Sequence, residues 1–337
     1  MTELFADRPN LRRVVMIGYF DVHDGNPNGD PSNGNHPRYD EYTGQGEVSD
    51  VSVKRHLRDA FADLGHEIFI EKGIPLATKK RAVMEVVAPD LDFSSLDEAP
   101  AAPTGEDTDA PTPKGRKSSK KSKTEVTPEQ IAEARRVICS RFIDMRLFGA
   151  TLGANKENLL KLENIRGCTN ISFSRSVNAI QVRDHQIVRT TTENDKVARG
   201  ESSMNQTFGQ KPLVCYGLYQ MMVIFDLKEA RANGVSQEDF DLLVEQLVGL
   251  YQNRPSAARG PQIGMQALYA FYVEATGVAA LSATQCRSFV KAEQRTDGVA
   301  RSFQDFRISV AEKSLPSSVT LETIVKPIFT DELKFAA

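Results

Sequence analysis

Three stretches of the chain are dominated by apolar, β-branched or aromatic residues, and each predicts a β-strand. Arg12–Val22 is short and ends at a run of Gly, Asn and Pro residues. Leu213–Leu227 is apolar throughout, which favours a central strand that is covered on both faces. Ile263–Ala275 has the composition of a further strand.

Three other segments carry apolar residues at helical spacing behind an N-terminal cap. The caps are Ser49 or Asp50, Thr127 with a capping box to Gln130, and Ser236 with Asp239. We expect the first helix to stop at Gly65 and the second, with Pro128 in its first position, to continue toward Gly149. The expected buried stripes are Val53, Leu57, Ala60 or Phe61 and Leu64; Ile131, Ala134, Ile138, Phe142 and Met145; and Phe240, Leu243, Val244, Leu247, Val248 and Tyr251.

The order strand, helix, strand occurs twice, which predicts an α+β fold with a ferredoxin-like or RRM-like sheet and helices on one face. Between residues 166 and 212 the sequence is rich in Arg, Thr, Asn and Ser, and we expect an extended hairpin that projects from this core. From residue 88 to 126 it is acidic and Pro-rich and then basic. Such a segment buries too little apolar surface to offset the entropy of ordering, so it is predicted to be a disordered insertion.

The composition narrows the class of protein. The 337 residues have a formal net charge of −3, which argues against a uniformly basic surface but leaves local patches open. The four cysteines, at 139, 168, 215 and 286, form no CxxC pair, so neither a zinc site nor a disulfide framework is indicated. No stretch reaches the ~18 apolar residues of a membrane span, and no signal peptide is apparent. We expect a soluble cytoplasmic protein without a cofactor.

The most distinctive segment is the polar loop from Gly25 that runs into the helix carrying Lys54, Arg55 and Arg58. Its repeated Gly, Asn and Pro residues favour a shaped loop with outward backbone N–H groups, which suits anions. A calcium loop beginning at Asp24 fails because its twelfth position is Asn35, where a Glu is required. Neither a Walker loop nor a G-x-G-x-x-G motif is present.

Positive charge gathers in three places beside glycine-rich or extended segments. Lys54, Arg55 and Arg58 lie on one helix, with Arg38 in the loop before it. Between Arg166 and Arg199 six basic residues stand against three acidic ones, and Arg254 and Arg259 flank a Gly-Pro turn. Each residue alone is more often a solvated charge, but three such patches favour a groove that follows phosphates. Two aromatic residues of the second region are candidates for base stacking or for the core: Phe173 and Phe208.

Three aspartates lie in or just before the Gly/Asn loop: Asp21, Asp24 and Asp30. Together they could hold a divalent metal that cleaves a phosphodiester. The alternative is that Asp21 ends a strand and the other two cap turns through their side chains. The surrounding Asn and Pro residues favour the capping role.

Several long motifs, in order, carry a resemblance to a known family. GNPNGDP, then GN-x-PR and VSDVSVKRHLRD, resemble the start of the backbone subunit of Cascade, the type I CRISPR interference complex, in the RAMP superfamily. CSRFIDMRLFGA, ISFSRSVNAI, QKPLVCYGLYQ and RPSAARGPQIGMQALYAF continue it over nearly the whole chain outside the insertion. The later motifs are most similar to the type I-C branch.

The resemblance implies an RRM-like palm, a helical finger region and a long β-hairpin thumb. On this basis the chain divides into residues 10–87 and 213–337 for the palm, 88–126 for the insertion, 127–165 for the finger region, and 166–212 for a strand and the thumb. The resemblance implies a non-catalytic subunit whose copies assemble head to tail along a CRISPR guide RNA with other Cascade subunits, while the guide pairs with target DNA. The enzymatic alternative is a metal-dependent endoribonuclease that uses a loop aspartate.

The predicted RNA-binding residues come from the loop, the basic helix, the base of the thumb and the Gly-Pro turn. They are Asn26, Asn28, Arg38, Lys54, Arg55, Arg58, Arg166, Ser174, Arg175, Ser176, Arg189, Phe208, Lys211 and Arg259. The sequence departs from relatives that carry Met-Gly-Arg-Lys before the YGLY motif, because here the residues are Phe208, Gly209, Gln210 and Lys211. Phe208 retains an apolar side chain for a wedge role.

Overall fold

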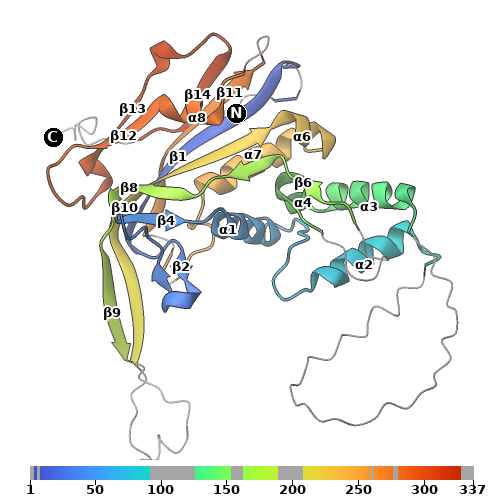
Figure 1. Cartoon of the computed structure of the whole chain (residues 1–337), viewed down its shortest axis with the longest axis horizontal. Coiled ribbons are helices and arrows are strands. Elements are labelled where there is room, and N and C mark those ends of the chain that lie inside the picture. The colour runs from blue at the N-terminus through green and yellow to red at the C-terminus, as the bar shows by residue number, and fades with distance from the viewer. Residues whose placement is uncertain are drawn as a thin grey trace, which may run out of the picture.

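The structure is a computed structural model that describes residues 4–5, 8–91, 126–152, 162–188, 208–256, 258–259, 262–275 and 280–327, with the backbone only at 188 and 208. In these residues eight strands form one sheet in the order β14-β11-β1-β10-β8-β4, with β7 and β9 also paired to β10 (Figure 1). These strands are β1 (Leu11–Gly25), β4 (Gln45–Val48), β7 (Thr169–Ile171), β8 (Ser174–Ala179), β9 (Val182–Val188), β10 (Phe208–Asp226), β11 (Ile263–Glu274) and β14 (Val319–Val325). All pairings within it are antiparallel.

The three predicted strands lie side by side at the centre of this sheet. β1 pairs with β10 on one side and with β11 on the other. Along β10, Val214, Met221 and Phe225 are buried on one face and Leu218 on the other, so the prediction of a strand covered on both faces is confirmed. In an antiparallel sheet with one solvated face, apolar and polar residues alternate along each strand. The sequence of β10 does not show this alternation.

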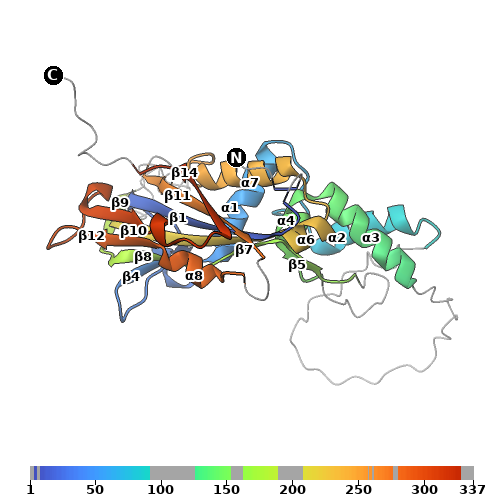
Figure 2. The same ribbon diagram turned by 90° about the horizontal axis from the view of Figure 1, so that it is seen from above.

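Two layers cover the sheet (Figure 2). Helices α1 (Asp50–Asp63) and α7 (Gln237–Val248) pack on one face together with α6 (Leu227–Ala232), and their apolar stripes join the larger core. The opposite face is partly covered by α8 (Ala283–Ser288) and the hairpin of β12 (Val290–Gln294) and β13 (Phe306–Val310). The sequence predicted helices on one face only, and this second layer was not foreseen.

The local helix signals are confirmed at each N-terminus. Ser49 caps α1, and capping boxes start α3 (Pro128–Arg141) at Thr127 and α7 at Ser236. Two expectations were wrong: Leu64, the C-cap of α1, is exposed, and the second helix breaks at Phe142, where extended backbone separates α3 from α4 (Ile143–Phe148).

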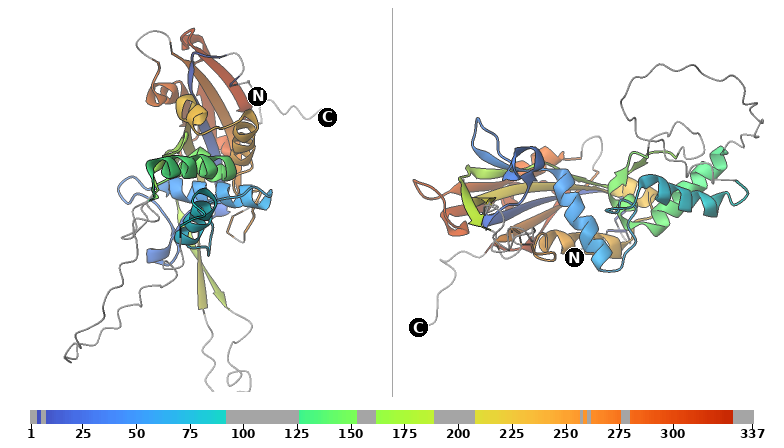
Figure 3. Two further views of the ribbon diagram at one scale, coloured as in Figure 1. Left: turned by 90° about the vertical axis from the view of Figure 1, so that its right-hand side faces the viewer. Right: turned by 90° about the horizontal axis from the view of Figure 1, so that it is seen from below.

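The helices α2 (Leu76–Val87), α3 and part of α4 form a separate small core beside the sheet (Figure 3). It contains Val83 and Met84 of α2, Ala134 and Ile138 of α3, and Met145 of α4. The sequence predicted α3 but not α2. Most of the predicted insertion, residues 92–125, lies outside the described residues. Its ends were predicted incorrectly, because Ala88 is buried in this core and Leu91 and Val126 pack against it.

A long hairpin projects from the sheet where the sequence predicted one (Figure 1). β9 pairs with the first part of β10 from Val182↔Val214 to Val188↔Phe208. The connection between them, residues 189–207, lies outside the described residues. The remaining short elements are β2 (Gly29–Asp30), β3 (His36–Pro37), β5 (Gly149–Ala150) and β6 (Ile165–Arg166), with 3₁₀ turns at Pro31–Asn33, Phe303–Asp305 and Glu312–Ser314. Among the helices that the structure describes, none is long and apolar enough to span a membrane.

Candidate nucleic-acid interface

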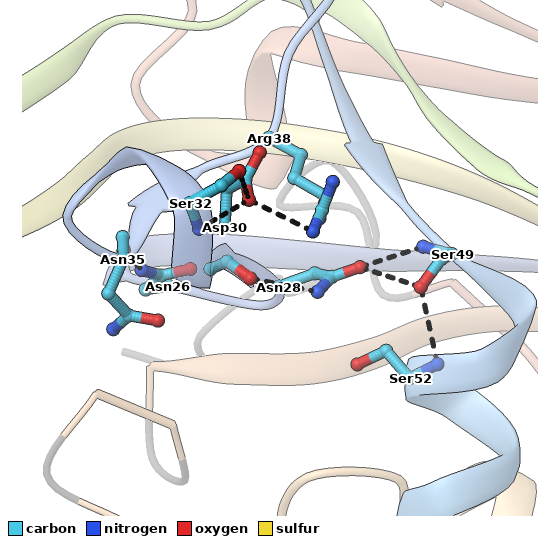
Figure 4. A network of polar contacts seen from close by, with 9 residues as sticks. Asn26, Asn28, Asp30, Ser32, Asn35, Arg38, Ser49 and Ser52 are labelled. Carbon is cyan, nitrogen blue, oxygen red and sulfur yellow. Dashed lines mark hydrogen bonds and ion pairs between the residues drawn. The ribbon is translucent and has the colours of Figure 1, made fainter. Parts of the chain in front are cut away.

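The Gly/Asn loop is fixed to the start of α1 by the side chain of Asn28 (Figure 4). The Asn28 Oδ1 atom accepts hydrogen bonds from the backbone N–H and the hydroxyl of Ser49, each at 2.9 Å. The Ser49 hydroxyl in turn accepts from the Ser52 N–H and caps the helix. One amide side chain therefore joins the loop to a helix N-terminus, where the helix dipole favours anions.

Asp30 and Arg38 form the second support of the loop (Figure 4). Asp30 Oδ1 accepts from the Ser32 hydroxyl at 2.7 Å, from the Ser32 N–H at 3.0 Å and from Arg38 Nη2 at 3.2 Å. The hydrogen bonds from Ser32, with the charge of Arg38, lower the pKa of Asp30, so it is ionised at neutral pH. The capping role expected for Asp30 is confirmed, because it caps the 3₁₀ turn that begins at Pro31.

Asn26 ties the loop to the segment before β11. Its side-chain amide donates to the Asn35 carbonyl and its backbone N–H donates to the Ala258 carbonyl, both at 2.8 Å. Asn35 has φ of 61° and its side chain lies where a Cβ on Gly29 would be, so this close approach requires glycine at position 29. The loop is thus held from both ends by its own side chains.

Arg259 lies close to the same region through its contact with α1. Its Nη1 atom is 2.5 Å from His56 Nε2. Burial and the charge of Arg259 lower the pKa of His56 to about 4, so the ring is neutral at pH 7 and can accept from the guanidinium. The structure therefore brings Arg259, from the third predicted basic patch, next to the loop and α1, which form the first.

The three basic residues of α1 are not equivalent. Lys54 pairs with Asp50 at 3.0 Å, and Arg55 pairs with Asp59 and donates to the Ile70 carbonyl. These pairs are partly exposed, and such pairs stabilise a fold by only ~0–1 kcal/mol, so they can exchange a carboxylate for a phosphate at little cost.

Arg58 is engaged differently. Its side chain is 12% exposed and bonds at 2.9 Å to Asp144, which is fully buried. Asp144 also accepts from the backbone N–H groups of Phe69 and Ile70. The expected contiguous patch of three available cations is therefore reduced to Lys54 and Arg55, and Arg58 links α1 to α4.

At the base of the hairpin, the three neighbouring candidates of β8 separate by face. Ser174 and Ser176 are buried, and the Ser176 hydroxyl accepts from the Gly46 N–H at 2.8 Å. Arg175 points to the other face, half-exposed, with its guanidinium 2.9 Å from Glu47 and 3.7 Å from Asp40. In this arrangement Arg175 is accessible and Ser176 supports the backbone of β4, whereas the buried Ser174 hydroxyl has no hydrogen-bond partner among the described residues.

The remaining candidates are scattered. Arg166 lies in β6, where its side chain is exposed and 4.0 Å from Glu229 of α6, apart from the loop and the hairpin (Figure 1). Lys211 lies in β10 opposite His185 of β9, and the backbone of Phe208 pairs with Val188. Arg189 lies outside the described residues. Except for Arg166, the described candidates thus lie around the loop, α1 and the base of the hairpin, or along the hairpin itself, where Phe208 is at the far end of the described pairing.

The family that the sequence matches is described as CRISPR-associated protein Cas7, and the match spans residues 12–311. The chain belongs to this family. Among curated relatives, the CRISPR-associated protein Cas7 of Haloferax volcanii is 24% identical over 243 residues, which cover 69% of this chain and 62% of that protein. The chain therefore spans less than two thirds of the length of this Cas7 relative.

Two solved structures with weaker likeness to this chain are chains of CRISPR RNA-guided surveillance complexes. One, in a pre-nicking form, aligns with a TM-score of 0.43 and 15% identity, covering 82% of this chain and 86% of that chain. The other aligns with a TM-score of 0.41 and 12% identity, covering 79% of this chain and 72% of that chain.

The three aspartates of the nuclease hypothesis each have separate partners in this Cas7-family chain. Asp21 lies within β1, not at its end as expected, and accepts from Gln266 at 2.9 Å; burial raises its pKa. Asp24 lies 3.4 Å from His23, and Asp30 caps the loop turn. Within the described residues, no group of three or more His, Cys, Asp and Glu side chains is arranged to hold a metal ion.

Three residues that position the candidate interface were not predicted in these roles: Ser49 as the partner of Asn28, His56 as the partner of Arg259, and Asp144 as the partner of Arg58. Only Asp144 had a local signal, because it is a lone carboxylate inside the apolar run FIDMRLF. Charges in such positions are usually paired.

Proposed function

We propose that this Cas7-family chain is an RNA-binding backbone subunit that oligomerises along a CRISPR guide RNA in a type I-C Cascade complex. The observation that carries the proposal is the Asn28–Ser49 junction, which holds a Gly/Asn loop against a helix N-terminus beside Arg38 and Lys54. Backbone amides and cations at such a junction suit phosphate oxygens. The guide would then recognise foreign DNA by base pairing.

The elements can be assigned to the parts of the hand that the family resemblance implied. β1, β10 and β11 with α1 and α7 would be the RRM-like palm, α2–α4 the finger region and the β9–β10 hairpin the thumb. The division into 10–87, 88–126, 127–165, 166–212 and 213–337 is retained as part of this proposal, except that α2 moves from the palm to the finger region. The core that α2 shares with α3 and α4 supports this assignment, and the projecting hairpin supports the thumb.

The phosphate ligands that we propose are first Arg38 and Lys54, and then Arg55, Arg175, Arg259 and Lys211. Arg38 and Lys54 hold partly exposed pairs that a phosphate can replace. Arg58 is better suited to a supporting role, because a phosphate could reach it only by leaving the Asp144 carboxylate buried and unpaired. Other copies of the chain and other Cascade subunits would be its protein partners, in the cytoplasm and without a cofactor.

Charge reversal of Arg38 and Lys54 tests the proposal. The double variant Arg38→Glu/Lys54→Glu should bind single-stranded RNA at least tenfold more weakly. The logarithm of the association constant should also fall less steeply with the logarithm of the salt concentration, by roughly one unit of slope for each phosphate that the variant no longer binds. Fluorescence anisotropy at several salt concentrations measures both quantities. Arg136→Glu, an exposed cation on α3, is the matched control and should leave binding unchanged. An unchanged salt slope in the double variant would remove this junction from the interface.

The proposal includes no catalytic step. Incubation with RNA and Mg²⁺ tests this, and Asp30 is the residue to replace. Wild-type protein incubated with single-stranded RNA and Mg²⁺ should form complexes of stepwise increasing size without shortening the RNA. Cleavage that disappears in Asp30→Ala would instead support the metal-dependent endoribonuclease. The absence of any complex would contradict both RNA-binding functions.

A further inference from the structure

Arg259 differs from most of the other candidate phosphate ligands in the partner of its guanidinium. Its Nη1 atom lies 2.5 Å from Nε2 of His56, and within the described residues it forms no ion pair with a carboxylate. Five other candidates are each paired with an aspartate or a glutamate: Arg38, Lys54, Arg55, Arg58 and Arg175. A carboxylate competes with a phosphate for a cation, whereas a neutral imidazole orients the cation and leaves its charge unbalanced.

The charged groups around His56 keep its ring neutral. Asp59 is the acidic group close to the ring, and it already pairs with both Arg55 and Arg254. Burial of the ring and the charge of Arg259 lower the pKa of His56 to about 4. At pH 7 the ring therefore carries one proton, on Nδ1, and Nε2 accepts a hydrogen bond from the guanidinium.

The His56 ring is held in place by Tyr251. The two rings meet edge to face with their centroids 4.8 Å apart, and Tyr251 packs in turn against Phe20 of β1. Tyr251 is 2% exposed and has φ of 68°, a left-handed conformation that is strained for an aromatic residue. Such strain persists only where the surrounding structure fixes the residue, and it is frequent at binding sites. The histidine therefore has little freedom to turn away from Arg259.

The backbone of Arg259 is fixed beside the Gly/Asn loop. Arg259 and Ser256 exchange backbone hydrogen bonds of 2.6 and 3.0 Å, and the carbonyl of Ala258 accepts from the Asn26 N–H at 2.8 Å. The side chain is thus held at both ends, at the backbone by the loop and at Nη1 by His56. Its Nε atom is buried and has no partner in the described residues, which leaves the Nη2 side of the guanidinium for an anion.

We propose that His56 is a positioning residue that holds the Arg259 guanidinium beside the Gly/Asn loop for a phosphate of the bound RNA strand. The inference rests on the proposed function and deepens it, because it assigns a neutral histidine to an interface otherwise made of cations and backbone amides. No ion pair has to be broken when Arg259 binds a phosphate. Without the histidine acceptor the side chain is free to move, and the entropy of fixing it is then lost on binding.

A double-variant cycle with a single-stranded oligouridine RNA tests the inference at neutral pH. Arg259→Gln should weaken binding about tenfold, because it removes a charge-assisted hydrogen bond. His56→Leu should weaken binding roughly threefold, because the cation remains but is no longer fixed. Since His56 acts through Arg259, adding His56→Leu to Arg259→Gln should cause no further loss. Fluorescence anisotropy measures the affinities, and thermal unfolding followed by circular dichroism shows whether each variant is folded.

Two further replacements of His56 separate the acceptor from the shape of the side chain. The amide oxygen of His56→Gln can reach the position of Nε2, so this variant should bind within about twofold of wild type. His56→Asn is too short to reach Arg259 and should bind as weakly as His56→Leu, which it replaces in the cycle if His56→Leu does not fold. His66→Leu, at an exposed histidine just after α1, is the matched control and should bind as wild type.

Wild-type affinity of Arg259→Gln or of His56→Leu overturns the inference and leaves the phosphate contacts proposed for Arg38 and Lys54 intact. Equal losses from His56→Leu in the presence and absence of Arg259 also overturn it, because the histidine would then act on the fold and not through the arginine. The same holds if His56→Gln is folded and binds as weakly as His56→Leu. Wild-type protein that does not bind the probe overturns the proposed function itself.

Discussion

Replacing Asp144 by alanine is expected to lower the free energy of unfolding by about 3–5 kcal/mol, because the variant leaves the Arg58 guanidinium unpaired in a largely buried site. Asp144 is fully buried and accepts three hydrogen bonds, from Arg58 Nε at 2.9 Å and from the N–H groups of Phe69 at 2.7 Å and Ile70 at 3.1 Å. The two backbone amides would lose their partner as well, which adds to the cost. Urea unfolding followed by circular dichroism measures the change.

Two variants separate the buried pair from a general effect of losing a carboxylate. Glu85→Ala removes the acid of an exposed pair with Arg81 on α2 and should cost less than ~0.5 kcal/mol. Asp144→Leu combined with Arg58→Met removes both charges and should recover part of the loss, since only the two amides then remain without an acceptor. A loss below 1 kcal/mol in Asp144→Ala would show that the site hydrates or rearranges in the variant.

The features that the sequence predicted correctly are those decided by neighbouring residues. Caps at Ser49, Thr127 and Ser236 depend on a side chain and an amide three residues away, and all three are present. The central strands followed in the same way from composition alone. The helix α2 was missed although Leu76, Val83 and Val87 have helical spacing, because no capping side chain marks its start at Pro75.

The features that it predicted incorrectly depend on distant partners. The helix expected to run through Phe142 breaks there, and the break is followed directly by α4, whose Asp144 reaches amides 74 and 75 residues earlier in the chain. Helix propensity is a weak preference that such tertiary contacts override. The same partner removes Arg58 from the expected patch, since spacing on a helix shows which residues share a face but not which of them are already paired.

The sequence predicted which candidate residues lie near one another better than it predicted the contacts that each of them makes. The loop, α1 and Arg259 do meet, and the Asn26 and Asn28 side chains expected to face a ligand instead hold the loop together. Residues that shape a loop and residues that bind through it have the same composition, because Asn, Asp and Ser satisfy backbone groups as readily as ligands.

Replacing Asp239 by asparagine should lower the free energy of unfolding at pH 7 by about 3 kcal/mol and make the remaining stability less sensitive to acid. Asp239 accepts two parallel hydrogen bonds from Arg146, at 2.7 and 2.8 Å, in a largely buried site between α4 and α7. Asparagine keeps an oxygen for the Ser236 N–H of the capping box but removes the charge that balances Arg146.

The direction of the pH effect follows from the pKa of this carboxyl. Burial alone would raise the pKa of Asp239, but the hydrogen bonds from Arg146 and the Ser236 amide and the charge of Arg146 outweigh it, and the pKa is lowered. A carboxyl with a lowered pKa in the folded state stabilises the fold fully above its unfolded value of about 3.9, and this contribution is lost as the pH falls through the folded value. Wild type should therefore lose more stability than Asp239→Asn between about pH 5 and pH 2.

Urea unfolding at pH 7, 5 and 3 measures both effects, and Asp241→Asn on the same helix is the control, because among the described residues Asp241 bonds to the Gln237 side chain alone. Asp239 matters more because α4 carries both Asp144, which pairs with α1, and Arg146, which pairs with α7. One short helix thus fastens the α2–α4 core to α1 and α7, two of the helices that cover the sheet. If Asp239→Asn and wild type lose equal stability on acidification, the ion pair between the Asp239 carboxylate and Arg146 does not stabilise the fold. The attachment of α4 to α7 would then depend on apolar packing alone.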